Sequence, residues 1–202
     1  MSRSSTSRAR ARPAASEPSA YLYVEGPRDR EIVEGWAQRV SPRLAARVRE
    51  ATVILGGRQP ARAREHLAEA RAEGREVRGL CVLDRDHEPE RAAAGADGLE
   101  LLIWGRRHIE SYLLVPAALG RVLRGVEPRA LRALANELPA ADDERSWREL
   151  DAKRRLAAVG PRLPWGRVAR AMREDELHAD VRAFLARLAA HFGVGFALEH
   201  VS

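Results

Sequence analysis

Short apolar runs alternate with longer amphipathic stretches over the first half of the chain. Four runs rich in Val, Leu, Ile and Tyr have the length and composition of buried β-strands, and they lie at 21–24, 52–55, 77–83 and 99–104. Apolar spacing and helix-boundary residues predict helices at about 27–40, 61–72 and 107–114. Strands that alternate with helices favour parallel pairing with right-handed crossovers. The third run is almost fully apolar and shows no alternation, which is typical of a strand covered on both faces.

After Pro116 the strand patterns stop, and residues 117–192 show helical patterns that Gly and Pro interrupt. Residues 193–201 fit either a closing strand or a tail. Residues 1–18 consist mainly of Ser, Arg, Ala and Pro and lack the apolar side chains that a core needs. We therefore predict a disordered basic tail at 1–18, a doubly wound α/β domain at 19–116 and an α-helical annex at 117–202.

The chain is basic, with a formal net charge of +6 and a pI of about 10.5. This charge fits a polyanionic partner such as nucleic acid, but it does not establish one. Of the 35 Lys and Arg residues, Lys153 is the only lysine. Coding bias in a GC-rich genome explains an excess of arginine, and we give that interpretation the greater weight.

The single cysteine, Cys81, excludes a disulfide framework within one chain and fits a reduced compartment. No apolar stretch approaches the roughly 20 residues that span a bilayer, and the N-terminus lacks the apolar core of a secretory signal. We expect a cytoplasmic protein with no membrane partner, and we leave open whether it forms a homo-oligomer.

Acidic residues follow the predicted strands at positions where ligands collect in parallel sheets. Glu25 follows the first strand, Asp84 and Asp86 follow the third, and Glu110 begins the helix after the fourth. If the first and third strands are neighbours, Glu25 faces the Asp pair, since the carboxyl ends of parallel strands share one edge. Clustered carboxylates are typical ligands of Mg²⁺ or Mn²⁺, and the group could hold one ion or two.

Each of these acids also has a structural explanation. Asp-x-Asp at the end of a strand occurs in ordinary turns. Asp29 and Glu110 fall in the first turns of predicted helices, where the helix dipole favours a negative charge. For Asp29 the structural interpretation is as good as a role in binding a second ion. The four acids on one rim nevertheless favour a metal site, because the structural explanation would have to hold several times.

Four segments resemble known motifs. Residues 24–29 (VEGPRD) resemble the first motif of the TOPRIM domain, a strand followed by Glu-Gly-x-x-Asp, and residues 82–86 (VLDRD) resemble the second, a strand ending in Asp-x-Asp. Residues 54–57 (ILGG) resemble the strand and glycines between them. Residues 104–114 (WGRRHIESYLL) are similar to the Ile-Glu-Asn-Tyr-Leu-Leu segment of the OLD (overcoming lysogenization defect) nucleases and of the DUF4435 TOPRIM-like proteins.

This resemblance covers about residues 20–116 and implies a TOPRIM-type, Rossmann-like α/β fold. It also implies a metal-dependent nuclease that hydrolyses phosphodiester bonds of DNA or RNA, with Glu25, Asp84 and Asp86 as catalytic metal-binding carboxylates. Ser111 stands where the segment more often has Asn, and His87 follows the Asp pair. We expect the metal site to tolerate both changes.

The resemblance to OLD-type nucleases also implies a functional lysine C-terminal to the metal motifs, and Lys153 falls in that region. We expect Lys153 to stabilise charge that develops at the phosphate, although chance survival on a solvated helix face explains it equally well. Arg106, Arg107 and Arg154 are candidate phosphate contacts, and ordinary surface positions explain them as well. Such nucleases often act with an ABC-type ATPase in phage defence. The chain has no Gly-x-x-x-x-Gly-Lys-Ser/Thr motif, so that ATPase would be a separate protein.

Three alternatives compete with the nuclease interpretation. A catalytically silent TOPRIM-like module could bind nucleic acid or a protein partner, although the retained acids argue against it. A phosphoacceptor receiver domain also has an acidic Mg²⁺ pocket and a lysine, but it usually carries paired acids after the first strand. A topoisomerase needs a nucleophilic tyrosine in a second domain. Tyr21 and Tyr23 belong to a predicted strand and Tyr112 to the 104–114 segment, so none of the three fits that role.

Overall fold

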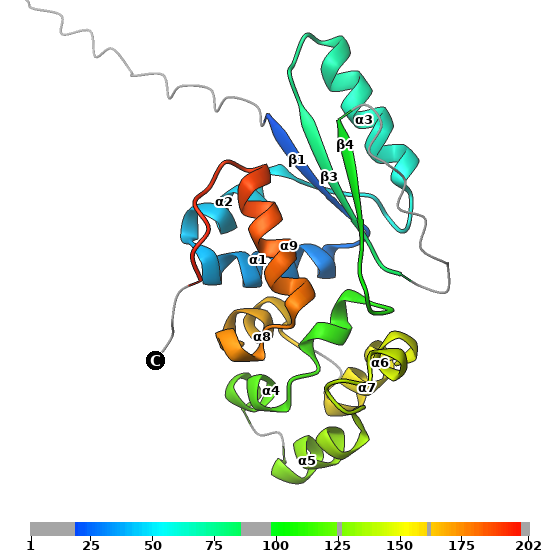
Figure 1. Ribbon diagram of the computed structural model, residues 1–202, viewed down its shortest axis with the longest axis vertical. Helices are drawn as coiled ribbons and strands as arrows, with labels where there is room; N and C mark the ends of the chain where they lie inside the picture. The colour runs from blue at the N-terminus through cyan, green and yellow to red at the C-terminus, as the bar shows by residue number, and fades with distance from the viewer. Residues whose placement is uncertain (1–18, 86–97, 125–126, 161–162, 199–202) are drawn as a thin grey trace, which may run out of the picture.

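The computed structural model describes residues 19–85, 98–124, 127–160 and 163–198. The predicted tail at 1–18 lies outside the described residues, as do Asp86 and His87. Figure 1 shows a sheet at one end of the molecule and a group of short helices beyond the carboxyl ends of the strands.

A four-stranded, entirely parallel sheet forms the centre of the first half, with the strand order β2-β1-β3-β4. Its strands are β1 (Ala20–Val24), β2 (Thr52–Ile54), β3 (Arg78–Leu83) and β4 (Leu99–Ile103). The predicted parallel α/β fold is therefore confirmed, and each predicted strand is found within a residue or two of its expected bounds. Because β1 and β3 are direct neighbours, the residues that follow them meet at one edge.

Different helices pack against the two faces of the sheet. Leu22 and Val24 of β1 face a large core, which α1 (Pro27–Val40), α2 (Pro42–Ala51) and α9 (Ala179–His191) help to form. Tyr21 and Tyr23 face a smaller cluster under α3 (Pro60–Ala72). Alternate side chains of a strand point to opposite faces, so both sets are buried and the run shows no polar alternation.

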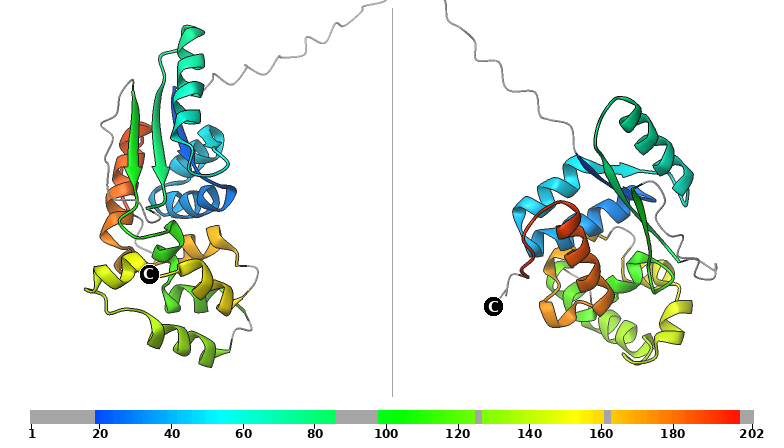
Figure 2. Two further views of the ribbon diagram at one scale, coloured as in Figure 1. Left: turned by 90° about the vertical axis from the view of Figure 1, so that its right-hand side faces the viewer. Right: turned by 45° about the horizontal axis from the view of Figure 1, so that its top comes forward.

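Short helices make up the annex: α4 (Pro116–Val122), α5 (Pro128–Glu137), α6 (Glu144–Glu149), α7 (Ala152–Val159) and α8 (Trp165–Ala171). A 3₁₀ turn η2 (Glu174–Glu176) leads into α9, which runs back beside the sheet (Figure 2). There His191 Nε2 lies 3.0 Å from the carbonyl oxygen of Tyr21, and Arg78 donates to the carbonyl of His191.

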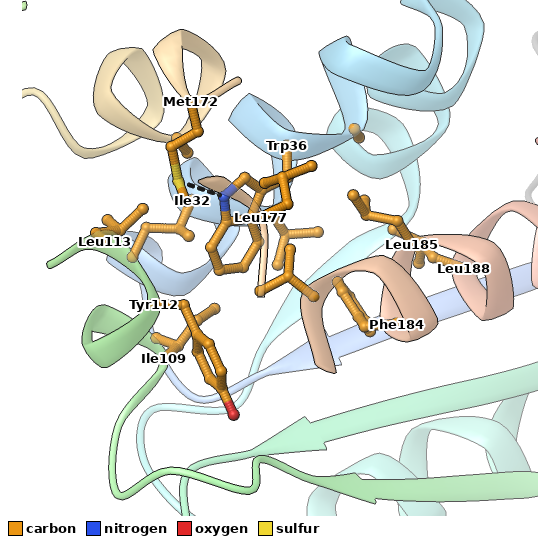
Figure 3. Close-up of a cluster of buried hydrophobic side chains, with 14 of the residues drawn as sticks. Ile32, Trp36, Ile109, Tyr112, Leu113, Met172, Leu177, Phe184, Leu185 and Leu188 are labelled. Atoms are coloured by element: carbon orange, nitrogen blue, oxygen red, sulfur yellow. Dashed lines mark hydrogen bonds between the residues drawn. The ribbon is translucent and has the colours of Figure 1, made fainter. Parts of the chain in front are cut away.

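The annex and the sheet share one core (Figure 3). Trp36 of α1 is fully buried, and its Nε1 donates to Sδ of Met172 at 3.4 Å. Trp104, which follows β4, packs against Phe184 of α9 with ring centroids 5.0 Å apart. Buried aromatic side chains of this size dominate core energetics, so the annex is an integral part of the folded protein.

Three local features differ from the sequence prediction. The helix α2 was not predicted, although Ser41 caps it by accepting a hydrogen bond from Leu44 N–H at 3.1 Å. The helix expected at 107–114 is a 3₁₀ helix, η1 (Ile109–Leu113). The described residues 194–198 form no strand, so the closing strand that 193–201 could have formed is not observed there. In the described part of the chain, no helix is long and apolar enough to cross a membrane.

Candidate active site

Glu25 and Asp84 lie side by side at the carboxyl edge of the sheet. Val24 of β1 pairs with Val82 of β3, which sets the residues after the two strands close together. Oε1 of Glu25 accepts a hydrogen bond from the backbone N–H of Asp84 at 2.7 Å. Glu25 thus lies beside Asp84, as expected for neighbouring first and third strands, while Asp86 lies outside the described residues.

The carboxylate of Asp84 is buried and held at one oxygen. Its Oδ1 accepts a hydrogen bond from the N–H of Ile109 at 2.8 Å, at the start of η1, and its Oδ2 lies 3.4 Å from Nζ of Lys153. Burial raises the pKa of Asp84 to about 7, against the opposing effects of the Ile109 hydrogen bond and the Lys153 charge. Asp84 Oδ2 is thus the oxygen that faces the middle of the rim.

Glu110 is the most deeply buried of the candidate acids that the structure describes, with 1% of its side chain exposed. Its Oε1 accepts a hydrogen bond from Nη1 of Arg28 at 2.9 Å. Its Oε2 is buried and has no hydrogen-bond partner, and Nζ of Lys153 lies 3.9 Å from it. A buried carboxylate oxygen without a hydrogen bond is costly, so a positive charge is needed at this position.

Lys153 belongs to the annex and lies beside Asp84 and Glu110 at the carboxyl edge of the sheet. It lies in the first turn of α7, which Asp151 caps by accepting from Arg154 N–H at 3.0 Å. Burial alone would lower the pKa of Lys153, but the charges of Glu110 and Asp84 outweigh it and raise that pKa. The side chain is a protonated ammonium and is 45% exposed, so it faces both the acids and solvent.

Asp29 occupies the first turn of α1 and accepts a hydrogen bond from the N–H of Gly26 at 2.8 Å. Burial raises its pKa despite that bond, and the charge of Glu110 raises it further. The structure thus gives Asp29 the capping role expected of a first-turn acid, and it also places Asp29 in the electrostatic field of the rim.

The three arginines that were candidate phosphate contacts differ in their surroundings. Arg106 is buried, pairs with Glu144 at 3.0 Å and stacks on the ring of Trp147 at 3.9 Å, which favours a structural role in attaching α6. Arg107 is partly buried. Burial lowers the pKa of the neighbouring His108, and the charges of Lys153 and Arg107 lower it further. Arg154 is exposed beside Lys153 on α7.

Two arginines that the sequence did not single out also contact this rim. Arg28 pairs with Glu110, and Arg58, from the loop after β2, donates to the backbone carbonyl of Asp84. The N–H groups of Gly56 and Gly57 in that loop donate to the carbonyl of Glu25, and both glycines have positive φ. The only sequence signal for Arg28 was its place inside the 24–29 motif.

The rim offers oxygen ligands of the kind that Mg²⁺ and Mn²⁺ prefer. Within residues 19–85, 98–124, 127–160 and 163–198, no three His, Cys, Asp or Glu side chains are arranged to hold a metal ion. Asp86, the second acid of the pair after β3, lies outside those ranges. The ammonium of Lys153 faces Asp84 Oδ2 and Glu110 Oε2. These two oxygens therefore direct their negative charge toward the position that a cation occupies.

Comparison with solved structures shows the same fold in known proteins. The C-terminal region of the Burkholderia pseudomallei OLD protein superposes with a TM-score of 0.51 at 15% identity, over 85% of this chain and 97% of that one. The C-terminal region of the Xanthomonas campestris pv. campestris OLD protein gives a TM-score of 0.49 at 17% identity, over 87% and 96%. No protein-family model matches the sequence, and no curated protein does.

Proposed function

We propose that this chain is a Mg²⁺- or Mn²⁺-dependent nuclease that hydrolyses phosphodiester bonds of DNA or RNA. The observation that carries the proposal is the convergence of Glu25, Asp84, Glu110 and Lys153 on one edge of the sheet. These residues come from four separate segments, and the last of them is the sole lysine of the chain. The OLD-type fold supports the same activity class.

Two carboxylate oxygens support a divalent-cation site at this edge, although the described residues alone include no group of three ligands arranged to hold a metal ion. Asp84 and Glu110 each have one oxygen fixed by a hydrogen bond and a second oxygen that faces the ammonium of Lys153. The ammonium therefore stands in for the positive charge that these two oxygens require. We propose that Asp84 and Glu110 hold the ion with Glu25 and Asp86, and that Asp29 supports a second ion.

If Asp84 and Glu110 hold a divalent ion, the chemistry that it would supply is Lewis acidity toward water and the phosphate. The protein residues do the positioning. Ile109 N–H orients Asp84, and Glu25 ties the end of β1 to the end of β3. Lys153, half exposed beside the acids, binds a non-bridging phosphate oxygen and stabilises the charge that builds there, since a compact ammonium acts as a point charge.

The net charge of +6 supports a polyanionic substrate. Arg154 is exposed on the same helix as Lys153 and would contact the backbone phosphates nearby. As in the nucleases that the motifs resemble, a separate ABC-type ATPase in phage defence is the proposed partner.

The test is a calorimetric Mn²⁺ titration of the wild type and of Asp84→Ala/Asp86→Ala, followed by cleavage assays on mixed DNA and RNA. We expect metal binding and cleavage in the wild type and neither in the variant. Glu65→Ala/Glu69→Ala removes two exposed acids from α3 and is the matched control, which should behave as the wild type. A folded wild type that binds no metal would refute the proposal and favour the catalytically silent binding module.

A further inference from the structure

One arginine links the acidic rim to the annex. Nη1 of Arg28 donates to Oε1 of Glu110 at 2.9 Å, while its Cζ lies 4.5 Å from the centroid of the Trp165 ring. Trp165 is the first residue of α8, and Arg28 lies in the first turn of α1. A planar guanidinium can stack on an aromatic face and still donate in its own plane to a carboxylate, which an ammonium cannot do.

Two glycines bring the tryptophan to this position. Arg28, Glu31 and Gly35 share one face of α1, because positions three and seven residues later return to the same side of a helix. A Cβ on Gly35 would lie 2.3 Å from the carbonyl oxygen of Gly166, and one on Gly166 would lie 2.8 Å from that of Glu31. The backbones of α1 and α8 are thus in direct contact, and Trp165, next to Gly166, is fixed over Arg28.

The consequence concerns which oxygen of Glu110 is available. Arg28 occupies Oε1, and Oε2 is buried without a hydrogen bond and faces Lys153. The two oxygens are chemically equivalent, so what the Arg28 hydrogen bond fixes is the orientation of the carboxylate plane, and a ligand whose plane turns freely binds a metal less well.

We propose that Arg28, held in place by Trp165, is a positioning residue that fixes Glu110 with Oε2 turned toward the metal. The inference rests on the proposed metal site and adds to it a dependence on the annex. Through this contact, the position of α8 controls the geometry of a ligand on η1.

Variants that keep the charge separate positioning from simple electrostatics. If Arg28 acted only as a positive charge near the acids, a change that keeps that charge would leave metal binding unaltered. A positioning Arg28 instead predicts weaker binding in such variants. Arg28→Lys keeps the charge and loses the planar fork, and Trp165→Leu leaves Arg28 intact and removes its support.

The experiment is a calorimetric Mn²⁺ titration of the wild type, Arg28→Lys, Trp165→Leu and the double variant. We expect each single variant to bind about 10-fold more weakly, as for other residues that orient a metal ligand. The double variant should bind no more weakly than Arg28→Lys, because both changes act through one side chain. Arg28 is 45% exposed, so Arg28→Lys should fold even if Trp165→Leu does not, and thermal denaturation checks both.

Trp147→Leu is the matched control, because it removes a comparable arginine–tryptophan stack from the pair formed by Arg106 and Glu144. Its Mn²⁺ affinity should equal that of the wild type. Folded variants that bind Mn²⁺ as well as the wild type or better, or a double variant with additive losses, would overturn the positioning role and leave the metal site intact. A wild type that binds no Mn²⁺ would overturn the metal site and this inference with it.

Discussion

Nζ of Lys153 lies 3.4 Å from Oδ2 of Asp84, although 69 positions separate the two residues in the chain. The aspartate ends a central strand of the sheet, and the lysine belongs to a short helix of the annex. The annex therefore contributes a charged group to the rim, and a sheet domain without it would lack this cation.

Lys153→Met should lower the cleavage rate by about 10²- to 10³-fold, the usual loss when one group that stabilises transition-state charge is removed. Mn²⁺ affinity should be retained or rise, because a positive charge that faces Asp84 Oδ2 and Glu110 Oε2 is gone. Single-turnover assays and calorimetry measure the two effects separately. Arg154→Met, on the neighbouring exposed position, is the control and should lose far less activity. Full activity in Lys153→Met would show that the lysine has no catalytic part.

Gly35→Ala should destabilise the protein by about 1–3 kcal/mol through overpacking. Alanine at an ordinary helical glycine stabilises by up to about 1 kcal/mol, so the sign is diagnostic. The loss is expected because the added Cβ meets the carbonyl oxygen of Gly166. Urea denaturation measures it. In Gly120→Ala the new Cβ meets only a methyl group of Leu131 at 3.1 Å, and this variant should be neutral or more stable.

Met172→Ala should lower the free energy of unfolding by about 2–5 kcal/mol, since it leaves a cavity in a tightly packed core. It also removes the sulfur that accepts the hydrogen bond from Trp36 Nε1. The tryptophan fluorescence of the folded state should change as well, because the indole loses this contact. Phe196→Ala, at a side chain with 44% exposure, should change stability by no more than about 0.5 kcal/mol. Equal stability of the two variants would contradict the shared core.

His191 should make stability fall as the pH is lowered from 7 to 5. Burial lowers its pKa from 6.5 to about 4 in the folded state, with the nearby Arg78 charge adding to the effect and the Tyr21 carbonyl opposing it. Between these two values the unfolded chain binds a proton that the folded one excludes, so protonation favours unfolding. The expected loss is on the order of 1 kcal/mol, allowing for partial solvent access to the ring.

His191→Gln is the matched variant for that measurement, because its amide can still donate to the carbonyl of Tyr21. Urea denaturation at pH 7 and pH 5 should show a smaller pH effect in this variant than in the wild type. An identical pH dependence in both proteins would exclude His191 as the source.

The sheet and most of the rim followed from local patterns in the sequence. Strand 77–83 was recognisable because it is almost fully apolar, and Glu25 and Asp84 could be placed together because parallel strands share an edge. The strand order itself was a condition of that argument, since no local pattern states which strands are neighbours. The role of Asp86 stays a prediction.

Contacts that depend on long-range packing could not be predicted in this way. The stack of Arg28 on Trp165 requires α1 and α8 to touch, and the two glycines that permit the contact look like ordinary helix residues in the sequence. Lys153 was a candidate because of its residue type and the resemblance, and its distance to Asp84 was not derivable from spacing. The start of η1 also involves a long-range contact, since its first N–H group, that of Ile109, donates a hydrogen bond to Oδ1 of Asp84.

The hydrogen bond between Trp36 and Met172 has a consequence for how the chain can be divided. A fragment that ends at residue 116 would contain α1 but neither α8 nor α9, and it would expose to water the apolar stripe that carries Trp36. Such a fragment would tend to aggregate, because exposed apolar surfaces of this kind associate with one another in water. Sheet and annex share one core, so a piece purified for enzymology should include both.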